Sequence, residues 1–102
     1  MKECCREYLS EQFGGDVEIM KEIYDEYVKS VMEKKAELAG AIDAADWRGA
    51  DRMAHTLKGN ALASGDAEMC DVALELRKTI ALSDANASRA LLSRVEELSK
   101  GL

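Results

Sequence analysis

Hydrophobic residues recur every three or four positions along most of the chain, which is the spacing of one face of an α-helix. The pattern is longest over residues 17–44, where it weakens only at Lys34 and Lys35. A lysine stem can lie over apolar surface with its charge in water, or this part of the helix projects beyond its neighbours. Shorter patterns predict helices over residues 1–13, 47–64, 67–82 and 87–99.

Short polar or glycine-containing segments separate the predicted helices. Gly14 and Gly15 end the first one, and Gly65 is placed to end the third, with Asp66 directly after it. Such short connections require antiparallel neighbours. We therefore expect an all-α fold, an antiparallel up-down four-helix bundle with a short additional N-terminal capping helix. Residues 1–102 would form a single domain, as their number suggests.

Composition narrows the classes of function. The chain has no proline, 47% hydrophobic residues and a net charge of −6. An acidic surface argues against binding to nucleic acid or to an anionic membrane, because both require a basic surface. No apolar run is long enough to cross a bilayer, and the first residues do not resemble a signal peptide. We expect a cytoplasmic protein, and a monomer because nothing indicates an obligate dimer.

The cysteines do not indicate a metal site or a disulfide framework. There are three, Cys4, Cys5 and Cys70, an odd number without secretory context. Adjacent cysteines on a first helix are more often incidental than a redox or palmitoylation site, and both readings stay open. One histidine and three cysteines lack the spacing of a zinc site. We therefore expect neither a metal nor a cofactor bound by this chain.

His55 is the only histidine, and it lies off the apolar face of its predicted helix. At about 100° per residue, it points about 140° away from the centre of that face. Lys58 and Asp51 lie one turn on either side of it. Gly59, on the same side, costs about 0.5–1 kcal/mol relative to alanine in a helix. Its missing side chain opens room beside the imidazole. The apolar face consists of Ala50, Met53, Ala54, Leu57, Ala61 and Ser64.

Each of these residues also has an ordinary interpretation. A single histidine on a helix is usually a surface residue, and Lys58 could be a solvated lysine. Asp51 could hold the imidazole through a ring N–H, although it is more often an ordinary polar residue. Gly59 could allow two helices to approach closely, but it lies off the apolar face. Trp47 is interpreted as a packing residue.

The run His55-Thr56-Leu57-Lys58-Gly59, followed by Gly65, resembles the signature of the histidine-containing phosphotransfer (HPt) domain. The flanks are similar too. Phe13-Gly14-Gly15-Asp16 resembles the beginning of the family's long second helix, and Asp46-Trp47 resembles the acidic start of its histidine-bearing helix. One departure is Ser64, where the family usually has an aliphatic residue. The resemblance covers nearly the whole chain and implies the same helical bundle.

The resemblance implies that His55 is a phosphoacceptor in a relay. A sensor or hybrid histidine kinase, or its receiver domain, would supply the phosphoryl group, and a response-regulator receiver aspartate would take it. Lys58 would stabilise the phosphoryl charge and Gly59 would give the partner access. Mg²⁺ would belong to the receiver and not to this chain. The residues expected to dock the partner are Arg48, Asp51, Arg52 and Leu62.

Two alternatives remain. The chain has neither a Walker pattern nor a kinase glycine loop, so it is not expected to phosphorylate itself with ATP. It could instead be a non-catalytic docking module that sequesters a receiver or kinase. It could also be the excised phosphoacceptor domain of a larger chemotaxis-type kinase, although the absence of a linker favours a free-standing protein.

Overall fold

The computed structural model describes all 102 residues and contains five α-helices and no strands. The prediction of an all-helical fold is confirmed. Each predicted helix is present, with bounds that differ by at most two residues from those expected. The helices are α1 (Glu3–Phe13), α2 (Val17–Asp43), α3 (Trp47–Ala63), α4 (Ala67–Ala81) and α5 (Ala85–Ser99).

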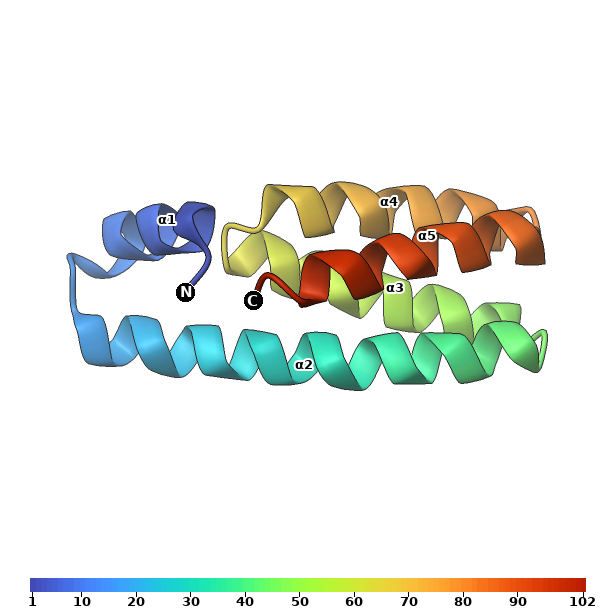
Figure 1. Cartoon of the computed structure of the whole chain (residues 1–102), viewed down its shortest axis with the longest axis horizontal. Coiled ribbons are helices and arrows are strands. Elements are labelled where there is room, and N and C mark those ends of the chain that lie inside the picture. Colours follow the sequence, from blue (N-terminus) through green and yellow to red (C-terminus); the bar gives the residue numbers. More distant parts are fainter.

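Helices α2 to α5 form a closed ring in which each helix packs against two others. The packed pairs are α2 with α3, α3 with α4, α4 with α5, and α5 with α2. Consecutive helices of this ring run in opposite directions, as their short connections require (Figure 1). The first helix is set apart from the ring. It lies along the N-terminal turns of α2, which extend beyond the other three helices (Figure 1).

Four helices begin in the same way, with an aspartate whose side chain accepts a hydrogen bond from the backbone N–H three residues later. This N-cap satisfies one of the amides that a helix start leaves unpaired. At the other end of α3, Gly65 has a φ of +75°, a left-handed conformation that favours glycine. The sequence thus contains the start and stop signals that set the helix bounds. The capping residues are Asp16, Asp46, Asp66 and Asp84.

The apolar faces meet in one core that runs through the ring. On α3 the predicted face is buried, except that Met53 is only half-buried. Lys34 and Lys35 are half-buried as well, and Nζ of Lys35 lies 3.3 Å from Oγ of Ser99 and 3.1 Å from a carboxylate oxygen of Glu96 on α5. The first interpretation of the lysine interruption is therefore correct. The part of α2 that projects beyond the ring is its N-terminal end.

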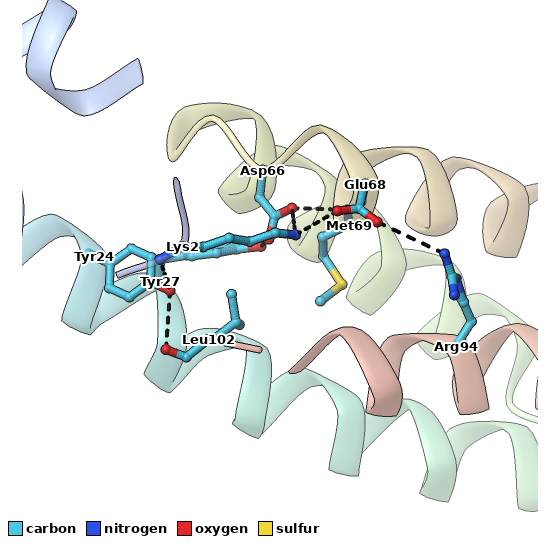
Figure 2. Close-up of polar contacts among 8 residues, drawn as sticks. All are labelled: Lys2, Tyr24, Tyr27, Asp66, Glu68, Met69, Arg94 and Leu102. Carbon is cyan, nitrogen blue, oxygen red and sulfur yellow. Dashed lines mark hydrogen bonds and ion pairs between the residues drawn. The ribbon is translucent and has the colours of Figure 1, made fainter. Parts of the chain in front are cut away.

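A buried polar network fastens the two ends of the chain to the bundle (Figure 2). The carboxylate of Asp66 is fully buried and lies 2.8 Å from Nζ of Lys2. It also accepts a hydrogen bond from the hydroxyl of Tyr27 at 2.7 Å, in addition to its capping bond. Tyr24 accepts from the backbone N–H of Lys2 and donates to the carbonyl of Leu102. Residues far apart in the sequence are thereby tied to one carboxylate.

No helix of the structure combines the length and the apolar composition that a membrane span needs. The exposed faces of all five helices carry charged residues instead.

Candidate functional site

His55 is exposed in the middle of α3, on the side of the helix that faces away from the core. Its neighbours Ala54 and Leu57 are fully buried, so they fix the orientation of this turn. The placement expected from the helical wheel is therefore what the structure shows. The ring is accessible to another molecule, and it is the only imidazole in the chain.

Arg77 on α4 connects His55 to Asp51. Nε and Nη2 of Arg77 lie 2.9 Å and 3.3 Å from the two carboxylate oxygens of Asp51, a two-pronged ion pair. Nη1 of the same guanidinium lies 3.2 Å from Nδ1 of His55. No protein group bonds to Nε2 of the ring. The three side chains thus form a chain of contacts that leaves one ring nitrogen free.

The ion pair changes the ionisation of its own members. The hydrogen bond from Arg77 lowers the pKa of Asp51, against the opposing effect of burial, and the nearby charges of Arg77 and His55 contribute in the same direction. The hydrogen bond to Asp51 raises the pKa of Arg77. The contact therefore favours the charged form of both groups.

The structure gives Asp51 a different role from the one the sequence suggested. Its carboxylate does not accept from the imidazole but from Arg77, which makes the contact with the ring. Arg77 was not identified from the sequence. A signal was available, because α3 and α4 form an antiparallel hairpin about Gly65, and a residue ten positions before its centre faces one about ten positions after it. Arg77 lies close to that position.

Lys58 and Gly59 occupy the next turn of α3 after His55. The side chain of Lys58 makes no hydrogen bond and no ion pair, so its charge is free for an incoming anion. A Cβ added at Gly59 would meet no atom within 4 Å. Packing within this chain therefore does not explain a glycine at this position.

The surface around His55 combines charged and apolar side chains. Arg48 and Arg52 are exposed on α3, and Leu62 is 63% exposed two turns after His55. A hollow between α3 and α4 runs beside the site and is lined in part by Arg48, Asp51 and Arg77. Leu74, which is 40% exposed, also lines it and was not predicted.

The remaining predictions for individual residues concern packing and metals. Trp47 is half-buried against the core. Cys5 is buried, and desolvation raises the pKa of its thiol to about 12. The structure contains no group of three or more histidine, cysteine, aspartate or glutamate side chains that could hold a metal ion.

Comparison with known protein families gives one match. The model of the family described as the Hpt domain matches residues 22–101, which include α3 and α4 in full and exclude α1. Comparison with curated proteins and with solved structures returned no match.

Proposed function

Because this chain belongs to the Hpt domain family, we propose that it relays a phosphoryl group through phosphohistidine at His55. The donor is a sensor or hybrid histidine kinase, or its receiver domain, and the acceptor is a receiver aspartate of a response regulator. The observation that carries the proposal is the exposed, single imidazole, whose Nε2 has no hydrogen-bond partner in the chain. Family membership itself supports a phosphotransfer module of two-component systems.

The reaction is a transfer between two nucleophiles. The lone pair of Nε2 attacks the phosphorus of an aspartyl phosphate, an N–P bond forms, the P–O bond breaks, and the aspartate leaves as a carboxylate. The reverse steps pass the group to the next receiver. Such a transfer needs positioning and charge stabilisation more than covalent help from the protein. The unpaired ammonium of Lys58, one turn from His55, supplies positive charge for the phosphoryl oxygens.

The exposed side of α3 around His55 acts as the docking surface. Gly59 lets the partner's active site approach the ring, and the flanking residues contact the partner. Leu62 and Leu74 supply apolar area on either side of the site. The docking residues on α3 are Arg48, Asp51, Arg52 and Leu62.

The same proposal includes the cofactors, the oligomeric state, the location and the domain organisation of the protein. Mg²⁺ belongs to the receiver's acidic pocket, and this chain binds no cofactor and does not consume ATP. It works as a monomer in the cytoplasm. The four-helix antiparallel bundle is the frame of the site, with α1 as a cap, and residues 1–102 act as one domain. A phosphoacceptor domain of a larger kinase would present the same site, and the length of the gene distinguishes the two.

The test is a transfer assay with purified protein. Wild type, His55→Gln and His55→Ala are each mixed with a phosphorylated receiver or an active hybrid kinase from the same organism. We expect an acid-labile, base-stable label on wild type alone. Transfer to a receiver by His55→Gln would disprove the proposal. Clear binding to a donor without any label would instead show a docking module that sequesters its partner.

A further inference from the structure

The contact between Arg77 and His55 determines which ring nitrogen carries a proton. A guanidinium group can only donate hydrogen bonds. Since Nη1 of Arg77 lies 3.2 Å from Nδ1 of the ring, Nδ1 must present its lone pair to the guanidinium. A neutral imidazole has one N–H, which in this geometry is therefore on Nε2.

This tautomer cannot attack phosphorus through Nε2, because the proton occupies the lone pair that would form the new bond. We propose, on the basis of the function proposed above, that Arg77 is a positioning residue that holds His55 in this non-nucleophilic tautomer. The nucleophile forms only when Nδ1 is released from the guanidinium. In the resting protein Arg77 therefore keeps His55 from reacting, and we call this effect the guarding role of Arg77.

Asp51 makes this arrangement stable while leaving it reversible. Its carboxylate takes two of the guanidinium N–H groups, so the arginine plane is fixed and only Nη1 reaches the ring. When Nη1 leaves Nδ1, the ion pair with Asp51 is not broken. Release therefore costs one hydrogen bond at an exposed site, an amount that the contacts of a docking partner easily exceed.

The protons balance in the proposed cycle. On release, Nε2 gives its proton to water and Nδ1 takes one from water, so that the ring stays neutral. Attack by Nε2 leaves the phosphorylated ring with a proton on Nδ1 and a positive charge. Loss of that proton to water restores a lone pair at Nδ1, which can again accept from Arg77. The guanidinium thus fits both the resting ring and the neutral phosphorylated ring, but not the nucleophile between them.

Two kinetic consequences follow. Arg77 slows the capture of a phosphoryl group, because the nucleophilic tautomer must first form. It also keeps the captured group from being lost, because an imidazole without a proton on Nδ1 is a poorer leaving group. A glutamine at this position can donate through its amide N–H or accept through its oxygen, so it fits either tautomer. We therefore expect Arg77→Gln both to gain label faster and to lose it faster.

Nitrogen NMR of the imidazole tests the tautomer directly, without any phosphoryl donor. His55 is the only histidine, so an untagged, ¹⁵N-labelled protein gives one pair of ring signals. At about pH 8, where an imidazole is mostly neutral, we expect wild type to carry its proton on Nε2. Arg77→Glu places an acceptor at the same position and should move the proton to Nδ1. Arg77→Gln should change the tautomer ratio about tenfold or more, the size expected for losing a hydrogen bond to a charged group.

Lys78→Gln is the matched control, since Lys78 is the next residue on α4 and pairs only with Glu75. It should leave both the ring signals and the transfer rate unchanged. A proton on Nδ1 in wild type, or the same tautomer in wild type and Arg77→Glu, would overturn the inference.

The transfer assay separates this inference from the function on which it rests. Equal rates of label gain and loss for wild type and Arg77→Gln would overturn the guarding role of Arg77 while leaving His55 as the phosphoacceptor. If no variant accepts label from any donor, the proposed function fails, and the NMR signals still decide whether Arg77 sets the tautomer.

Discussion

Two aspartates of the α3–α4 hairpin each bind a basic side chain, but they differ in burial and in the number of their partners. Asp66, at the start of α4, is fully buried and bonded to Lys2, Tyr27 and its own helix (Figure 2). Asp51, on the outer side of α3, is 43% exposed and bonded to Arg77 alone. The contact of Asp66 with Lys2 joins distant parts of the chain, while the contact of Asp51 with Arg77 orients the guanidinium towards the imidazole.

The difference shows how the molecule separates stability from chemistry. A buried charge that loses its partner costs about 3–5 kcal/mol, whereas an exposed ion pair contributes about 0–1 kcal/mol. The network around Asp66 therefore holds the fold and tolerates little change. The pair around Asp51 contributes little to folding, so Arg77 can leave the ring without endangering the bundle.

The largest effect is expected from removing the buried carboxylate. Asp66→Ala removes the N-cap of α4 and leaves the buried hydroxyl of Tyr27 without an acceptor, while Lys2 keeps its ion pair with Glu68, so the free energy of unfolding should fall by about 2–4 kcal/mol. Asp51→Ala should lower it by less than about 1 kcal/mol. Urea denaturation followed by circular dichroism measures both.

Asp84→Ala separates capping from the network. Asp84 caps α5 but makes no other side-chain bond, so its loss should cost only about 1 kcal/mol. Equal losses for Asp66→Ala and Asp84→Ala would show that the buried network adds nothing beyond the cap.

The next effect is a loss of stability in alkali that originates in the same buried region. Burial raises the pKa of Tyr27 and of Cys5, the latter to about 12. The unfolded chain releases these protons first, from about pH 8.5 for cysteine and 10 for tyrosine. Stability should therefore be fully present below about pH 8.5 and fall as the pH rises towards 12.

Denaturant titrations at a series of pH values measure this slope. Burial raises the pKa of Tyr24 as well. Tyr27→Phe removes one of these three groups, so its stability should fall less steeply above pH 10 than that of wild type. Identical slopes for the two proteins would rule out Tyr27 as a source of the pH dependence.

The smallest effect on folding, and the clearest on function, is expected at Gly59. Gly59→Lys places a long side chain beside His55 and should slow phosphoryl transfer about tenfold or more, while raising the free energy of unfolding by about 0.5–1 kcal/mol. Gly40→Lys is the matched control, because a Cβ there also meets no atom within 4 Å. It should give the same gain in stability at an unchanged transfer rate; equal transfer rates for all three proteins would contradict a role for Gly59 in access.

The helix bounds and the side of α3 on which His55 lies could be predicted, because they depend only on residues close together in the sequence. The capping aspartates, Gly65 and the three-to-four spacing of apolar residues specify where helices begin, end and point. The same rules place Lys58 and Gly59 one turn from the imidazole. The sequence did not decide between the two interpretations of the interruption at Lys34 and Lys35, because the choice depended on whether α5 packs beside it.

The sequence by itself determined five helices, an exposed imidazole and the residues of its own helix around it. Only the tertiary structure decided that Arg77 reaches His55, that Asp51 holds the arginine and not the ring, and that Lys2 joins Asp66. Local rules act over one or two helical turns, whereas these contacts join residues separated by 22, 26 and 64 positions. Their geometry depends on the register between packed helices, which the interlocking of the core side chains sets.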